Sequence, residues 1–219
     1  MARKGWLVRV QRGVYAPVPL GTPTGAPVED PWTLAMALYA PGYIGGWSAA
    51  EHWDLTEQIF NRVCFMTTRA QRSRDQVHGG VEFCVTTTRK SRLFGTKKIW
   101  RGSSRVEVAD PTRLMVDILH APELGGGARH TLDVVANYWR SAHASPDLLL
   151  DYAERFGVGA VFKRIGFTAE LFGTVSDAWV RRCHERMSAG ISRLDPTGPE
   201  RGRIVTRWRL RVNTPLPSP

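Results

Sequence analysis

The chain has no long apolar run. None of its segments approaches the roughly 20 consecutive apolar residues that a membrane-spanning helix needs. The first ten residues are basic and hold no apolar stretch of signal-peptide length. We therefore expect a cytoplasmic protein without a membrane partner.

Cysteine is scarce, and the three that occur are Cys64, Cys84 and Cys183. They show neither a Cys-x-x-Cys motif nor the Cys/His spacing of a zinc site. This pattern argues against a disulfide framework, and we expect neither a metal nor a cofactor. Cys64 and Cys84 fall in two predicted strands, so they can lie close together. Buried free thiols and a disulfide both remain open.

The groups that bond-breaking chemistry needs do not occur together. Ser48 lies in Gly45-Gly46-Trp47-Ser48-Ala49, which departs from the Gly-x-Ser-x-Gly pattern of a nucleophile elbow. The basic β region offers only the carboxylates Asp75 and Glu82, and it has no Glu-x-Lys pair of the nuclease kind. We expect no catalytic residues and a protein that is not an enzyme. A nucleic-acid-processing enzyme subunit is the less favoured alternative.

Positive charge, by contrast, is abundant and uneven. The formal net charge is +10, and Arg outnumbers Lys by 25 to 5. Residues 69–105 hold 10 basic and 2 acidic side chains, residues 181–219 hold 9 and 3, and residues 106–180 hold 6 and 10. Such zones attract polyanions, and Arg matches phosphate geometry. Drift toward Arg in a GC-rich genome gives the same composition without any ligand.

Within the first basic zone, one group of side chains is the candidate surface for DNA or for an acidic protein partner. These residues are Arg89, Lys90, Arg92, Lys97 and Lys98.

The sequence pattern predicts an α+β fold that begins with two strands. Residues 6–17 read as a β-hairpin that turns at Gln11-Arg12-Gly13. Four basic residues lie on or before it, and a hairpin that carries arginines can straddle a phosphate backbone or enter a minor groove. The expected DNA-binding residues are Arg3, Lys4, Arg9 and Arg12.

A mixed β region follows a linker rich in proline and glycine at 19–30. Asp30 and Pro31 predict the start of a helix that ends at Tyr39, because an N-cap carboxylate and a first-turn proline favour helix entry. A short helix is expected at about 47–53. The predicted strands are 61–68, 80–88, 97–101 and 104–109.

From Asp110 onward the pattern is typical of helices. Asp110 can cap, Pro111 can occupy the first turn, and the triple glycine 125–127 ends the segment. Further helices are expected at 129–141, 146–156, 158–172 and 175–189 from apolar residues at three- and four-residue spacing. A strand over 204–212 and a loose tail at 213–219 complete the prediction.

Four motifs in a fixed order resemble one known family. They are Arg12-Gly13-Val14-Tyr15, Ser48-Ala49-Ala50-Glu51-His52-Trp53-Asp54-Leu55-Thr56, Val108-Ala109-Asp110-Pro111-Thr112-Arg113-Leu114-Met115-Val116-Asp117, and Val161-Phe162-Lys163-Arg164-Ile165-Gly166-Phe167 with Glu170-Leu171. Over about 160 residues this order resembles the AbiEi antitoxins of bacterial AbiE toxin–antitoxin systems, a type IV, phage-defence class. The resemblance implies a winged helix-turn-helix domain, an antitoxin domain, and autoregulation of the operon.

The resemblance also implies a division of the chain. Residues 1–18 correspond to the wing that ends the DNA-binding domain, and residues 31–212 correspond to the antitoxin domain, which counteracts a nucleotidyltransferase-like toxin directly or indirectly. The family places three helices before the wing, whereas about a dozen residues precede Gly13 here. We therefore expect a truncated winged helix, and operator DNA as a partner depends on the missing helices. A DNA-binding transcriptional regulator without an antitoxin role is the alternative.

Overall fold

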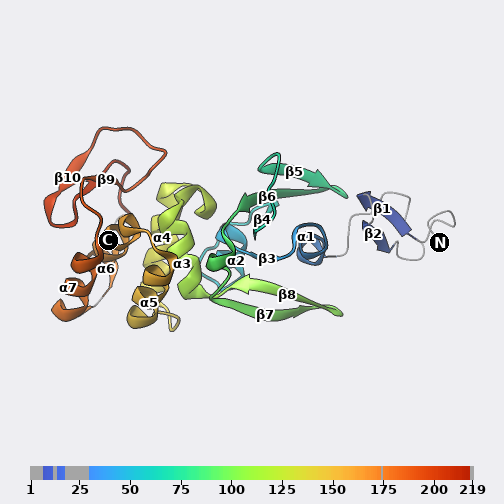
Figure 1. The fold of residues 1–219 in the computed structure, drawn as a ribbon, viewed down its shortest axis with the longest axis horizontal. Helices are drawn as coiled ribbons and strands as arrows, with labels where there is room; N and C mark the ends of the chain where they lie inside the picture. Colours follow the sequence, from blue (N-terminus) through green and yellow to red (C-terminus); the bar gives the residue numbers. More distant parts are fainter. Residues whose placement is uncertain (1–6, 12–13, 18–29, 174, 218–219) are drawn as a thin grey trace. The chain divides into compact units, whose positions relative to one another are not determined.

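The computed structural model describes residues 7–11, 14–17, 30–173 and 175–217 (Figure 1). The chain is α+β, as its sequence predicts. Its residues divide into two compact units, which interleave along the sequence. Unit 1 contains residues 1–44 and 60–108, and unit 2 contains residues 45–59 and 109–219. The range 31–212, which the resemblance assigns to one domain, therefore contributes to both units.

The predicted N-terminal hairpin is confirmed. Strand β1 (Leu7–Gln11) pairs with β2 (Val14–Pro17) in antiparallel register, and the register shifts between Arg9 and Gln11. The side chains expected to contact DNA, and the linker up to residue 29, lie outside the described part of the chain. DNA contact by Arg3, Lys4, Arg9 and Arg12 therefore stays a prediction.

Unit 1 is built on a six-stranded mixed sheet with the order β5-β6-β4-β3-β8-β7. Its strands are β3 (Gly42–Ile44), β4 (Arg62–Thr67), β5 (Asp75–His78), β6 (Val81–Thr87), β7 (Thr96–Arg101) and β8 (Ser104–Ala109). Four of them confirm the predicted strands, whereas β3 and β5 were not predicted. Strand β5 lies in the polar segment between the first two predicted strands.

Helix α1 (Pro31–Tyr39) packs against β3 and β4. It begins as predicted, because the Asp30 carboxylate accepts a hydrogen bond from the Trp32 backbone N–H at 2.9 Å and Pro31 occupies the first turn. At its other end the Tyr39 ring contacts the rings of Phe65 and Phe83. The helix thereby buries the apolar side chains of β4 and β6.

Unit 2 is mainly helical. Its helices are α2 (Gly46–His52), α3 (Pro111–His120), α4 (Ala128–Arg140), α5 (Pro146–Phe156), α6 (Gly159–Phe172) and α7 (Asp177–Arg186), with the 3₁₀ turn η3 (Pro122–Gly125) after α3. Each α-helix confirms a predicted one to within a few residues. Helix α3 packs against α2, α4, α5 and α6, and all of residues 111–119 are buried. It forms the centre of this unit.

The C-terminal segment corrects one prediction. A single strand over 204–212 is wrong, because the segment forms β10 (Arg203–Val205), the 3₁₀ turn η4 (Thr206–Trp208) and β11 (Leu210–Val212). These strands pair with each other, and β11 also pairs with β9 (Ser192–Arg193). The break occurs because the Trp208 side chain is completely buried against α6, and Arg209 turns the chain with a left-handed φ of 47°.

Candidate functional site

Three strands of unit 1 end at the same edge of the sheet. Strands β4 and β6 are parallel, with Thr67 opposite Thr87 at their carboxyl ends. Strand β3 is antiparallel to β4, and β8, which is parallel to β3, therefore has the opposite direction to β4 as well. Strand β7 is joined to β8 by a two-residue turn at Gly102, whose φ of 58° suits a tight hairpin. It is therefore antiparallel to β8 and points the same way as β4 and β6. Segments far apart in the sequence are thus brought together.

The carboxyl ends of β4 and β6 carry the same three residues. Thr67-Thr68-Arg69 follows one strand and Thr87-Thr88-Arg89 follows the other. The threonines fix the backbone of Arg69: its N–H donates to Thr67 Oγ1 at 3.0 Å, and its carbonyl accepts from Thr87 Oγ1 at 3.3 Å. The Thr88 N–H donates to the Thr67 carbonyl at 2.7 Å, which continues the pairing beyond the strands. The two arginines are therefore held side by side.

We call this region the cationic edge. It consists of Arg69, Arg72, Arg89, Lys90, Trp100 and Arg105, which are exposed side chains that follow β4 and β6 or flank the β7–β8 turn. Arg101 also flanks this turn but does not belong to the group, because it lies over the Trp32 ring and 3.5 Å from the Asp30 carboxylate. Within the described part of the chain, the five cations of the cationic edge form no ion pair with a carboxylate. Arg105 instead lies over the Trp100 ring, 4.5 Å from its centroid. The positive charge of this edge is consequently not neutralised within unit 1.

Two cations elsewhere in the sheet have carboxylate partners. Arg62, at the start of β4, contacts both Asp75 and Glu82. Near the start of β7, Lys98 lies 3.7 Å from Glu107. The two carboxylates considered for a nuclease site therefore serve as partners of one arginine.

The structure separates the basic residues that the sequence grouped together. Arg89 and Lys90 lie on the cationic edge, and Arg92 ends the 3₁₀ turn η2 (Lys90–Arg92). Lys97 and Lys98 lie near the amino end of β7, toward the opposite edge of the sheet. Sequence reasoning did not single out Arg69, Arg72 or Trp100 as candidate site residues. The repeated Thr-Thr-Arg at the ends of two predicted strands was the signal that could have found the first of them.

A surface hollow of about 440 Å³ adjoins the cationic edge. It is lined by the loop after β4, which includes Arg72, and by residues of β5. Gln76 organises this hollow, since its side-chain amide donates to Gln71 Oε1 and to the Ser73 carbonyl, both at 3.0 Å. Gln76 Oε1 accepts a hydrogen bond from Tyr39 Oη at 3.3 Å. The loop that presents Arg69 and Arg72 is therefore anchored to the body of unit 1.

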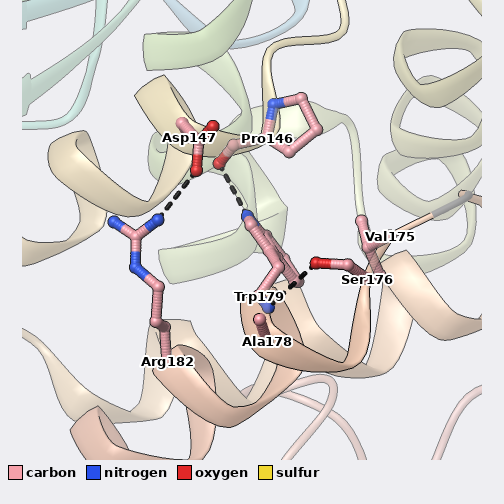
Figure 2. A pocket seen from close by; sticks show the side chains of 7 residues that line it. All are labelled: Pro146, Asp147, Val175, Ser176, Ala178, Trp179 and Arg182. Carbon is pink, nitrogen blue, oxygen red and sulfur yellow. Dashed lines mark hydrogen bonds and ion pairs between the residues drawn. The ribbon is translucent and has the colours of Figure 1, made fainter.

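A second hollow, of about 350 Å³, lies between the amino ends of α5 and α7 in unit 2 (Figure 2). Its polar groups bind one another. Arg182 contacts the Asp147 carboxylate at 2.7 Å, and Trp179 Nε1 donates to the Pro146 carbonyl at 2.9 Å. Ser176 caps α7 by accepting from the Trp179 backbone N–H. These contacts join α5 to α7. Because Asp147 neutralises Arg182, the hollow presents no unpaired charge.

A buried thiol pair lies in the middle of the sheet of unit 1. Cys64 on β4 is the register partner of Cys84 on β6, and both are free thiols. Arg74 Nε lies 3.1 Å from Cys84 Sγ. The hydrogen bond from Cys64, followed by the Arg74 guanidinium, lowers the pKa of the Cys84 thiol to about 6. The prediction that these cysteines occupy neighbouring strands is confirmed.

Comparison with known proteins gives information on the fold. No family model matches the chain, and no curated protein matches it. Among solved structures, it is similar to the crystal structure of the Rv2827c protein from Mycobacterium tuberculosis. The TM-score is 0.63 with 18% sequence identity, over 95% of this chain and 75% of that one. The two proteins share a fold. At this identity the likeness concerns the fold alone.

The motif on α6 has a packing role within that fold. Lys163 is completely buried, and its Nζ donates to the Gly190 carbonyl at 2.7 Å and to Ser192 Oγ at 3.1 Å. Arg164 donates to the Arg193 carbonyl and, at 2.8 Å, to the Leu119 carbonyl at the end of α3. Burial lowers the pKa of both side chains. These cations hold the C-terminal segment and α3 against α6.

The start of α3 is fixed by a comparable network. The Asp110 carboxylate accepts from the Arg113 backbone N–H at 2.7 Å and from Tyr152 Oη at 2.9 Å. Arg113 and Asp117 form a buried ion pair at 2.9 Å. The Asp110 carboxylate therefore caps the helix and the Asp117 carboxylate neutralises Arg113, so neither is available as a metal ligand.

Across residues 7–11, 14–17, 30–173 and 175–217, no three His, Cys, Asp or Glu side chains gather in a way that could hold a metal ion. Over the same ranges, every helix is too short or too polar to cross a lipid bilayer.

Proposed function

We propose that this chain acts as the antitoxin of an AbiE-like system and counteracts a nucleotidyltransferase-like toxin. One observation supports the proposal: two of the four motifs that resemble the family contact each other, and a third contacts the helix that one of them begins. Trp53 Nε1 donates to the Ala109 carbonyl at 2.7 Å, which joins the second motif to the third. Arg164 of the fourth motif donates to the carbonyl of Leu119, on the helix that the third motif begins.

This arrangement supports a family relationship for a physical reason. Residues that specify one fold must pack together even when they lie far apart in the sequence, whereas chance matches need not. The contacts between these motifs lie within unit 2, and each places a side-chain donor on a backbone carbonyl. These are packing contacts. In the proposed antitoxin the motifs therefore hold the scaffold together, and the toxin would be contacted by other residues that are exposed.

Growth rescue tests the proposal. The chain is co-expressed with the nucleotidyltransferase-like gene that we expect directly downstream of its own gene. The proposal predicts that growth, arrested by the toxin alone, is restored. Continued arrest in the presence of folded, well-expressed antitoxin would contradict it.

Charge reversal locates the contact surface. We expect glutamate at Arg89, Lys90, Lys97 and Lys98 to abolish rescue, because these exposed cations would then repel an acidic partner. A matched control places glutamate at Arg140, Arg181, Arg201 and Arg203, which are four exposed cations of unit 2. Unchanged rescue by the fourfold variant would exclude this surface while leaving the antitoxin assignment standing.

The second candidate function is a DNA-binding regulator without an antitoxin role. It is favoured by the β1–β2 hairpin, which lies in the part of the chain that the resemblance assigns to the family's wing. This alternative predicts binding to promoter DNA that weakens steeply as salt is raised, together with no effect on toxin-arrested growth.

A further inference from the structure

The cationic edge has two features that its packing does not require. The first is the pair of Thr-Thr-Arg segments at the carboxyl ends of β4 and β6, where ordered backbone positions Arg69 beside Arg89. The second is Trp100, whose residue surface is 63% exposed. Exposed cations are common on protein surfaces, where they favour solubility, but that role does not call for an exposed indole. Together, the two features point to a ligand that has both negative charge and planar apolar groups.

The first feature suits phosphate. A guanidinium presents paired N–H donors that match two oxygens of a phosphate group, and hydroxyls and backbone N–H groups supplement such contacts. Arg69, Arg89 and Lys90 are exposed and have no carboxylate partner in the described part of the chain. An incoming phosphate would therefore meet cations whose charge is still available. The Arg72 side chain lies on the adjoining hollow of the same loop.

The second feature suits a base. Arg105 lies over the Trp100 ring at 4.5 Å, so a cation–π contact covers one side of the indole and holds its orientation. A ring fixed in this way is a platform on which a nucleobase can stack. Bases stack on exposed aromatic side chains when they are free of a partner strand.

The distance between the two features also fits. In the sheet, β7 lies three strands away from β4 and four from β6, which places Trp100 roughly 14 Å from the end of β4 and roughly 19 Å from the end of β6. Distances of this size correspond to a few nucleotides along one strand. A strand can therefore contact the arginines through its phosphates and reach Trp100 with a base.

We propose that the cationic edge binds single-stranded nucleic acid, with phosphates on Arg69, Arg89 and Lys90 and a base stacked on Trp100. A duplex fits this surface less well, because its bases are stacked inside the helix. An acidic protein surface also fits less well, because it has no free nucleobase to stack on the indole. This activity goes beyond antitoxin function and requires no toxin, so the failure of one proposal leaves the other intact.

Fluorescence anisotropy with a labelled oligodeoxythymidylate tests the proposal on the full chain. We expect Trp100→Ala to weaken binding by about tenfold, because stacking contributes roughly that much for each base. Trp100→Phe retains an aromatic ring, and we expect it to preserve most of the affinity. An unchanged affinity in folded Trp100→Ala protein would overturn the proposal.

The phosphate contacts have their own measurement. We expect the double variant Arg69→Ala with Arg89→Ala to flatten the dependence of log K on log salt by about 1.4, because each contact to a single strand contributes about 0.7. The control, Arg181→Ala with Arg201→Ala, removes the same charge from exposed positions of unit 2. An equal effect of the control would show attraction by net charge alone and would overturn the assignment.

Competition experiments decide between ligand classes. An unlabelled single strand should displace the probe at lower concentration than a duplex of the same length, and polyglutamate should compete poorly. Stronger competition by the duplex would favour a groove-binding surface. Equal competition by polyglutamate would favour an acidic protein partner, and either result contradicts the proposal.

Discussion

One group of cations in unit 2 and another in unit 1 have opposite surroundings. In unit 2, Arg113, Lys163 and Arg164 are buried, and carboxylate or backbone oxygens accept their hydrogen bonds. On the cationic edge of unit 1, Arg69 and Arg89 are exposed and have no carboxylate partner among the described residues. A buried charge must be paired because its desolvation is costly, whereas an exposed charge keeps its hydration until a ligand replaces it. The same residue type thus holds the fold in one unit and remains available for binding in the other.

Removal of a buried partner should have the largest effect on stability. We expect Asp117→Ala to lower the free energy of unfolding by about 3–5 kcal/mol, because it leaves the buried Arg113 charge without its carboxylate. Urea unfolding measures the loss. Asp133→Ala is the control, since Asp133 is an exposed carboxylate on α4 whose loss should cost within about 0.5 kcal/mol. Equal losses for the two variants would contradict a structural role for the pair.

A substitution at the contact between α6 and the C-terminal segment should have the next largest effect on stability. A Cβ at Gly166 would lie 2.0 Å from carbons of the Trp208 ring, so Gly166→Ala must displace that ring. We expect a cost of about 1–3 kcal/mol in thermal or urea unfolding. Adding Trp208→Phe should recover part of it, because the smaller ring leaves room for the methyl group. Strictly additive losses in this double-mutant cycle would show that the two residues are not coupled.

The thiol pair gives unit 1 a dependence on pH. Because the pKa of Cys84 is lowered to about 6 when folded, its thiolate contributes stability that is complete above the unfolded pKa near 9.0. This contribution is lost as the pH falls through about 6. Between those values the free energy of unfolding should therefore rise with pH more steeply in the natural protein than in Cys84→Ser. Urea titrations at several pH values measure the two slopes, and equal slopes would contradict the assignment.

The smallest effect on stability is expected at the cationic edge. Arg69→Ala with Arg89→Ala should change the free energy of unfolding by no more than about 0.5 kcal/mol, because exposed cations without partners contribute little to folding. Relief of repulsion between neighbouring cations could even raise it slightly. Thermal unfolding checks this expectation. A loss of several kcal/mol would mean that these arginines hold the fold and are not reserved for a ligand.

Local signals in the sequence were sufficient for most of the helices. Helix α5 begins and ends where predicted, since Pro146 occupies its first turn and Gly157 adopts a left-handed φ of 75° after it. Strand β5 was missed because its four residues lie in a polar segment and are defined by pairing with β6. Residues 204–212 alternate like one strand, but the burial of Trp208 beside Gly166 breaks them.

Less of the candidate site than of the fold could be predicted from the sequence. The sequence located the basic zone, and it could have revealed the repeated Thr-Thr-Arg. It could not show which strands end at the same edge, because strand direction follows from pairing between distant segments. For that reason Arg89 and Lys97 were grouped together, whereas Arg69 and Trp100 were left out.

Hydrogen–deuterium exchange with and without single-stranded oligonucleotide tests the contrast between the units most directly. We predict slower exchange in residues 67–74, 86–92 and 99–105 when the oligonucleotide is bound. Residues 161–170, which hold the buried cations of α6, should exchange at the same rate in both states. Slower exchange over 161–170 without a change at the cationic edge would contradict the division of roles between exposed and buried cations.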